Sequence, residues 1–272
     1  MKSSWLSRLA GNSALIAAGT IWLLPYAWMT TTSFKSLDEI VRAPTAPWPE
    51  QPNLAAYREV FQSVPVGHYL LNTVIMALLI ATLQILLALP AGYALAKLHW
   101  RGKGAAMSLV LGCLLIPPQV TFVSVFAMLA PLGLINTMTS LVAPFAVSAF
   151  GTFLIRQALI AIPDEIIEAA RLDGASELRI IFGILAPLLR PTLVAMFLFS
   201  FIFHYSDYFW PLVMTTDDVN RTLPMGIALL REQGTGVRWH IVMAGNVILS
   251  APVLLVFLVA QRHIIRAVAR SS

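Results

Sequence analysis

Residues 104–155 read GAAMSLVLGCLLIPPQVTFVSVFAMLAPLGLINTMTSLVAPFAVSAFGTFLI and contain no Asp, Glu, Lys or Arg. One helical crossing of a membrane needs about 20 apolar residues, so this stretch of 52 residues is long enough for two crossings. Pro131, Gly133 and Asn136 lie in its middle and indicate a turn. The stretch therefore predicts two consecutive membrane helices joined by a short turn.

The same pattern recurs along the chain. Residues 9–34, 60–96, 191–206 and 239–261 also contain no Asp, Glu, Lys or Arg. We expect six membrane helices, near 13–33, 70–96, 105–130, 137–159, 191–213 and 240–261. Pro117-Pro118 predicts a kink in the third of them. The first is long and has no evident small-residue cleavage site after it, so we expect a retained anchor and not a cleaved signal peptide.

Composition supports an all-α polytopic membrane protein. Hydrophobic residues make up 58% of the 272 residues and charged residues only 11%, whereas soluble domains carry about 25% charged residues. We expect one membrane domain over residues 1–272. The single cysteine, Cys113, excludes an intrachain disulfide and a cysteine-based metal site.

Lys and Arg set the expected orientation. If the N-terminus is inside, the inner segments hold 12 of the 18 Lys and Arg residues, and the outer segments hold 8 of the 13 acids. Cytoplasmic segments of membrane proteins are enriched in Lys and Arg, so both termini are predicted to lie in the cytoplasm. This bias accounts for the net charge of +5 without a nucleic-acid partner.

Motifs for catalysis are absent from the sequence. The one Gly-Lys pair, Gly102-Lys103, has no glycine five residues earlier, so it is not a phosphate loop, and there is no HExxH, GxSxG or clustered metal-ligand pattern. No catalytic residue, metal site or cofactor is expected in this chain. An ion-coupled carrier normally buries ionisable relay groups in the membrane, and Asp207 is the one candidate.

The segment at about 160–190 is the longest expected inner loop. It predicts two short helices around a glycine turn, because Pro163 suits a first helical position and Gly174 supplies a left-handed stop. One predicted stripe of the first helix holds Glu165, Glu168 and Arg171. The opposite, apolar side is predicted to hold Ile162, Ile166, Ala169 and Ala170. Such a helix either lies on the membrane surface or docks to a partner protein, and the residue pattern alone leaves both interpretations open.

The same loop carries a family resemblance. Glu168-Ala169-Ala170, Asp173-Gly174-Ala175, Phe182, Pro187 and Pro191 resemble the EAA loop of ABC importer permeases. The resemblance runs nearly end to end and is to the carbohydrate-type, maltose-permease-like class. Its further matching segments are Ser33-Phe34-Lys35, Asn72-Thr73, Ala91 to Ala96, Leu134 to Thr137 and Asp207 to Leu212.

The resemblance implies a permease of the bacterial cytoplasmic membrane, with a coupling helix between the fourth and fifth membrane helices. It implies a second permease subunit, commonly a different chain, a dimer of ATPase subunits that uses ATP and Mg, and an extracytoplasmic solute-binding protein. Coupling to the ATPase is then expected from Glu168, Ala169, Ala170, Asp173, Gly174 and Ala175. Glu168 is expected to meet a basic residue of the ATPase, and Asp173 and Gly174 to shape the turn.

Three residues are candidates for the translocation path: Asn72, Tyr205 and Asp207. The expected solute is a sugar or a similar polar molecule. Glycerol phosphate or another non-sugar solute stays open, as does an ion-coupled secondary transporter that works without an ATPase, or a purely structural membrane subunit. The chain ends His263 to Ser272, without the Gly- and Lys-containing tail of many relatives, so the resemblance gives no support for a contact between the tail and the ATPase.

Overall fold

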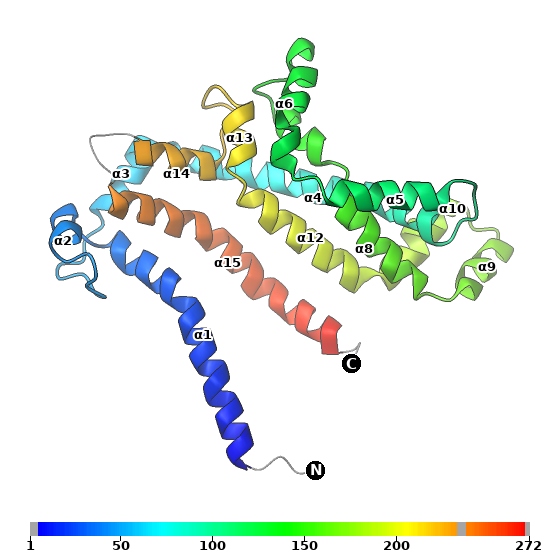
Figure 1. Cartoon of the computed structure of the whole chain (residues 1–272), viewed down its shortest axis with the longest axis horizontal. Helices are drawn as coiled ribbons and strands as arrows, with labels where there is room; N and C mark the ends of the chain where they lie inside the picture. Colours follow the sequence, from blue (N-terminus) through cyan, green and yellow to red (C-terminus); the bar gives the residue numbers. More distant parts are fainter. Residues whose placement is uncertain (1–4, 233–237, 270–272) are drawn as a thin grey trace. The chain divides into compact units, whose positions relative to one another are not determined.

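A computed structural model describes residues 5–232 and 238–269, with the side chains of 11–231, 238–256 and 258. Every regular element within these ranges is helical (Figure 1). Contacts divide the chain into two units, Met1–Val66 with Gly226–Pro252, and Gly67–Met225 with Val253–Ser272. The single domain expected over 1–272 stays a prediction.

The first unit contains α1 (Trp5–Ser33), α2 (Leu37–Arg42) and α3 (Ala55–Ser63), and parts of α14 (Leu223–Glu232) and α15 (Trp239–Ala269). The connection after α1 is held by polar contacts. Lys35 is fully buried, donates to the carbonyl oxygen of Ala46 and lies 5.4 Å from the Trp28 ring. The Glu39 carboxylate accepts a 2.8 Å hydrogen bond from the backbone N–H of Glu50. These contacts hold the segment in place, while its apolar side chains Leu37, Val41 and Trp48 stay exposed.

The second unit is organised on α4 (Val66–Ala96). A helix of 31 residues is about 46 Å long at 1.5 Å per residue, enough to cross a bilayer. The other elements of this unit, in chain order, are α5 (Lys103–Leu114), α6 (Pro118–Leu129), η1 (Ala130–Leu132), α7 (Met138–Val142), η2 (Ala143–Phe145), α8 (Ala149–Ile160), α9 (Asp164–Leu172), α10 (Glu177–Arg179), the π-helical η3 (Ile180–Leu185), α11 (Ala186–Leu188), α12 (Arg190–Tyr205) and α13 (Phe209–Met214).

One buried cluster joins the C-terminal half of α4 to α8, α9, η3 and α12. Its members include Leu89, Ile155, Ile167, Ile180 and Met196. Gly92 allows α4 and α8 to approach, because a Cβ at this position would lie 2.8 Å from the side chain of Ile155. The short helix α9 is therefore packed onto the membrane helices on one side.

Within the part of the chain that the structure describes, three helices are long and apolar enough to cross a membrane: Gly11–Ser33, Val66–Ala96 and Trp239–Val256. Three further helix pairs qualify together but are bent, by 102° between Lys103–Leu114 and Pro118–Leu132, by 40° between Met138–Phe145 and Ala149–Ile160, and by 85° between Glu177–Leu188 and Arg190–Tyr205. The count of six holds if each pair is one span, and it stays a prediction.

The sequence predicts helices near 105–130, 137–159 and 191–213, with a kink in the first of these three. The helices are interrupted at residues 115–117, 146–148 and 206–208. At the first interruption Pro117 is extended and Pro118 lacks an N–H, so the predicted kink is a full break. At the second, Ser148 starts a new helix by accepting from the N–H of Gly151 at 3.0 Å. At the third, Asp207 accepts from the backbone N–H groups that open α13.

Candidate functional site

The loop at 160–190 contains the expected short helix, α9. Asp164 and Glu165 lie in its first turn and Arg171 in its last, and each charge is favourable with the helix dipole. Pro163 immediately precedes the helix, one position earlier than predicted. Gly174 has φ of +76° and so adopts the left-handed conformation predicted for it.

The side of α9 that packs against protein holds only part of the predicted apolar side. Ile167 and Ala170 are buried at 3% and 8% exposure, whereas Ile166 and Ala169 are exposed. Ile166 and Ala169, which the sequence groups with Ala170 on the apolar side, therefore take no part in this packing. Ile167 and Ala170 are three residues apart and share a face, and this face packs in the cluster with Leu89.

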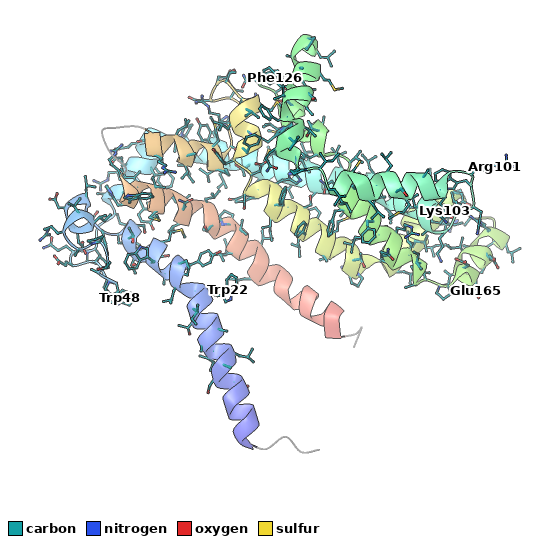
Figure 2. All side chains as sticks on the ribbon, viewed as in Figure 1. Trp22, Trp48, Arg101, Lys103, Phe126 and Glu165 are labelled. Atoms are coloured by element: carbon teal, nitrogen blue, oxygen red, sulfur yellow. The ribbon has the colours of Figure 1, made fainter. Side chains whose placement is uncertain are left out.

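The outward side of α9 consists of Glu165, Glu168, Ala169 and Leu172, and we call it the docking face after the role that the resemblance implies for this helix. All four are exposed, and Leu172 keeps 90% of its surface open. Glu165 lies at the edge of its unit in Figure 2. Sequence reasoning missed Leu172, although it follows Glu168 by four residues and Ala169 by three, which places it on their side of a helix. The docking face thus combines two carboxylates with an exposed apolar side chain.

The N-terminal end of α9 is held to the residue that follows the C-terminal end of α4. Lys97 is 8% exposed at its side chain, and its Nζ donates to Asp164 Oδ1 at 2.5 Å and to the carbonyl oxygen of Ile162 at 2.5 Å. The hydrogen bond and charge of Lys97 lower the pKa of Asp164 below its usual value. Because that pKa is lowered in the folded state, the stabilisation is present at neutral pH and is lost as the pH falls through the lowered pKa.

The other end of α9 is held to α4 by a buried tyrosine. The hydroxyl of Tyr93 donates to Glu177 Oε2 at 2.6 Å. Arg171 donates through Nε to Glu177 Oε1 at 2.9 Å and through Nη2 to the Tyr93 hydroxyl at 3.0 Å. The position of α9 is therefore fixed from α4 at both ends, while its docking face stays free.

Among the remaining residues of the predicted coupling loop, Asp173, Gly174 and Ala175 form the turn after α9. The backbone N–H of Ala175 donates to the carbonyl oxygen of Ala170 at 3.0 Å, and that of Asp173 donates to Ala169 at 3.0 Å. No atom lies within 4 Å of a Cβ built on Gly174, so its requirement for glycine is one of backbone conformation. The coupling role of these residues stays a prediction.

Asn72, a predicted residue of the translocation path, makes structural hydrogen bonds. Its side-chain amide donates to the carbonyl oxygens of Val219 at 2.8 Å and Arg221 at 3.0 Å. The segment it holds, 215–222, is also fixed by Asn136, whose side-chain oxygen accepts from the N–H of Thr216 at 3.0 Å. This geometry favours a role in shaping the 215–222 segment, and a role of Asn72 in the path stays a prediction.

The other two path candidates lie at the end of α12. Tyr205 is fully buried and its ring centroid lies 5.7 Å from that of Phe201. Asp207 accepts hydrogen bonds from the backbone N–H groups of Phe209 at 3.0 Å and Trp210 at 3.3 Å, and it lines a pocket of about 440 Å³. Roles for both in the path stay predictions. Among the described residues, no three His, Cys, Asp or Glu side chains gather as a metal site.

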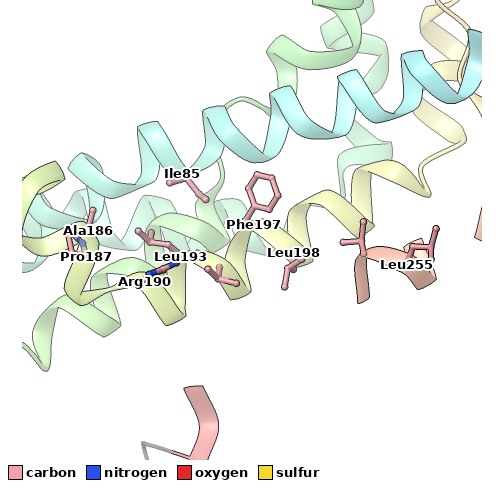
Figure 3. A pocket seen from close by; sticks show the side chains of 10 residues that line it. Ile85, Ala186, Pro187, Arg190, Leu193, Phe197, Leu198 and Leu255 are labelled. Carbon is pink, nitrogen blue, oxygen red and sulfur yellow. The ribbon is translucent and has the colours of Figure 1, made fainter. Parts of the chain in front are cut away.

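A larger pocket of about 800 Å³ lies beside α12 (Figure 3). It is lined by Arg190 and by apolar residues that include Ile85, Phe197 and Leu255. Among the described residues that line it, Arg190 is the one with a charge. Sites for small polar molecules carry several placed polar groups, so this pocket is unsuited to orient such a solute. It is the kind of surface that lipid chains or a neighbouring apolar helix fill.

Comparison with known proteins places these features in a family. Residues 84–270 match the family model described as "Binding-protein-dependent transport system inner membrane component". The chain belongs to this family. The match includes α9 with its docking face and the whole loop at 160–190, so the permease is an inner-membrane protein with several membrane helices.

Relatives of this permease are permease proteins of transport systems. It is 29% identical to the probable ABC transporter permease protein YurM of Bacillus subtilis, over 91% of this chain and 82% of the relative. It is 34% identical to the arabinooligosaccharides transport system permease protein AraQ of Halalkalibacterium halodurans, over 71% of this chain and 69% of the relative. It is 33% identical to the sn-glycerol-3-phosphate transport system permease protein UgpE of Pectobacterium atrosepticum, over 77% and 75%.

A solved structure shows the same fold. The crystal structure of a bacterial ABC transporter involved in the import of the acidic polysaccharide alginate contains a chain that matches the permease with a TM-score of 0.81. The match covers 96% of this chain and 99% of that chain, at 22% sequence identity. The helical membrane fold predicted from the sequence is confirmed by this likeness.

Proposed function

We propose that this permease translocates a sugar or a similar neutral polar solute into the cell and is driven by a separate ATPase that docks on α9. One observation carries the proposal: α9 is fixed to the membrane helices on its inner side and at both ends, yet presents a free face of Glu165, Glu168, Ala169 and Leu172. A helix held in this way can pass a movement of its partner to α4 and the helices packed on it.

The alternative, that α9 is a helix lying on the membrane surface, fits the geometry poorly. Such helices bury an apolar face among the lipids and are rich in Lys and Arg. In α9 the apolar side chains Ile167 and Ala170 are already packed against protein. On the exposed side, Ile166 and Leu172 stand together with the carboxylates of Glu165 and Glu168. Carboxylates are repelled by the negative surface of a cytoplasmic leaflet. A basic cleft on a protein partner suits this face better.

The proposed partners follow from the missing energy source. The chain carries no phosphate loop, so ATP and Mg are used by the ATPase dimer and not by this subunit. The family's description names a binding-protein-dependent system, which supports an extracytoplasmic solute-binding protein. A second permease subunit completes the proposed complex. Co-purification would show whether this second subunit is an identical or a different chain.

A second solute class has specific support. The relatives include a permease for sn-glycerol-3-phosphate beside one for arabinooligosaccharides. We propose the sugar, and keep glycerol phosphate as the second candidate. An ion-coupled carrier has no comparable support, because the chain's family is that of binding-protein-dependent systems.

Reconstitution tests the proposed function. Vesicles that hold the permease, its partner permease and the ATPase are expected to accumulate solute only when they are given ATP and the loaded binding protein. ATP hydrolysis is expected to rise with the loaded binding protein. Uptake by the chain alone, driven by a proton or sodium gradient, would show instead that the permease is a secondary carrier.

Cysteine labelling tests the proposed orientation, with both termini cytoplasmic. In a Cys113→Ser background, single cysteines within 97–104 and 163–190 are expected to react only with membrane-permeant reagents. Cysteines within 35–68 and 215–238 are expected to react with impermeant reagents in intact cells. Outside labelling of position 174 would reverse the proposed orientation.

A further inference from the structure

The three helix interruptions converge on two adjoining pockets of about 500 and 440 Å³. Residues next to or within each interruption line them: Ile116, Pro118, Val147, Ser148, Ser206, Asp207 and Tyr208. The pockets share Pro118, Phe145, Phe203 and Trp210, and together we call them the broken-helix cavity. At membrane depth, irregular backbone is tolerated where it is buried in protein or lines a cavity. Broken helices also form the solute sites of many transporters.

Buried polar side chains stand at this cavity. Gln84 donates to the carbonyl oxygen of Phe145 at 2.9 Å, and its Nε2 lies 3.4 Å from His204 Nε2. Ser200 and His204 are one turn apart on α12, line the 500 Å³ pocket, and are exposed by only 5% and 4%. Ser200 Oγ and His204 Nδ1 have no hydrogen-bond partner among the described residues. Polar atoms buried without partners are rare in proteins, so this pair calls for an explanation.

The cavity is unsuited to an anion. None of the described residues that line it is a lysine or an arginine, the usual partners of phosphate. At two of its helix starts, N–H groups are already used, because Asp207 accepts from Phe209 and Trp210 at α13, while Ser148 accepts from Gly151 at α8. An anionic solute would therefore meet a carboxylate and find no free cation.

We propose that the broken-helix cavity binds a neutral, hydroxyl-rich solute within the membrane, through Ser200 Oγ, His204 Nδ1 and the Gln84 amide. The inference rests on the proposed import function and deepens it. The rings of Phe145 and Phe203 lie 4.9 and 5.2 Å from the His204 ring. Rotation of these two rings opens the buried atoms to the solute, and their apolar faces then cover the C–H surface of a sugar.

The variant Ser200→Ala separates this role from a structural one. If the hydroxyl has no ligand, its removal leaves the complex equally stable or more stable and leaves uptake unchanged, because a buried polar group without a partner is a cost. If it binds solute, uptake of a radiolabelled neutral oligosaccharide below saturation falls about three- to tenfold, the effect of one lost hydrogen bond, with no fall in the unfolding temperature. Ser250→Ala is the control, since the Ser250 hydroxyl donates to Asn246 in its own helix at 2.7 Å and lines neither pocket.

The experiment uses the complete complex in vesicles, with a panel of neutral mono- and oligosaccharides and sn-glycerol 3-phosphate as probes. The expected result is ATP-dependent uptake of a neutral sugar of the panel, and an excess of sn-glycerol 3-phosphate should not inhibit this uptake. Uptake of Ser200→Ala equal to that of Ser250→Ala overturns the site, and import of glycerol phosphate overturns the solute class. A wild-type complex that neither imports any probe nor raises ATP hydrolysis with its binding protein contradicts the proposed function itself.

Discussion

Replacing Glu168 with alanine is expected to weaken assembly with the ATPase by about 30-fold or more and to abolish most solute-stimulated ATP hydrolysis. Removing one partner of a buried, hydrogen-bonded charge pair costs about 2–5 kcal/mol, and each 1.4 kcal/mol is tenfold in affinity. Glu168 is exposed on the docking face, so its removal leaves no unpaired group inside this chain. The permease itself should therefore insert and fold normally. Co-purification of the ATPase and its hydrolysis rate measure the effect.

Two further variants test whether the lost carboxylate of Glu168 causes the weaker assembly. Glu50→Ala removes an exposed carboxylate far along the chain from α9 and is expected to leave assembly unchanged. Glu168→Lys, combined with a reversed charge at the basic residue of the ATPase, is expected to restore part of the stimulation. Full ATPase stimulation and full uptake by Glu168→Ala would show that this carboxylate has no docking role.

Leu172→Asp is expected to weaken assembly at least 100-fold. Leu172 is 90% exposed in the isolated chain, and burying a leucine side chain contributes about 1.5–3 kcal/mol. The aspartate loses this contribution and also places an additional charge in the interface, which adds a desolvation cost. A total of about 3 kcal/mol corresponds to roughly 100-fold in affinity. Sedimentation or pull-down of the permease with its ATPase measures the change.

Leu54→Asp is the matched control for this variant. Leu54 is 64% exposed and immediately precedes α3, within the 35–68 segment proposed to lie outside. The same change of side chain there should leave ATPase binding intact. If Leu172→Asp assembles as well as Leu54→Asp, then Leu172 lies outside the interface and the docking face is smaller than proposed.

The membrane character of the chain and the position of the loop were predictable, because both depend on local sequence. A membrane helix needs a long run without charges, and the runs at 9–34 and 60–96 correspond to α1 and α4. The glycine stop was predictable in the same way. Its left-handed conformation at Gly174 depends on the residue type and on the helix that precedes it.

Features that depend on distant parts of the chain were not predictable. Tyr93 and Glu177 are 84 residues apart, and Gln84 and His204 are 120 apart, so no helical period relates them. The anchor Ile167 was missed because a nine-residue helix with apolar side chains on several sides does not reveal which of them meets the core. Which side of α9 becomes buried depends on where α4 and α8 lie, and the tertiary fold determines their positions.

The most direct measurement is photocrosslinking from the docking face in the assembled transporter. A benzophenone amino acid at position 165, at the edge of this face, should give a covalent product whose mass is the sum of the permease and one ATPase subunit. The same group at position 54 should give no such product. The central claim is that α9 docks the ATPase, and it predicts the first adduct. Crosslinks from position 165 to lipid alone, in a complex that contains the ATPase, would contradict it.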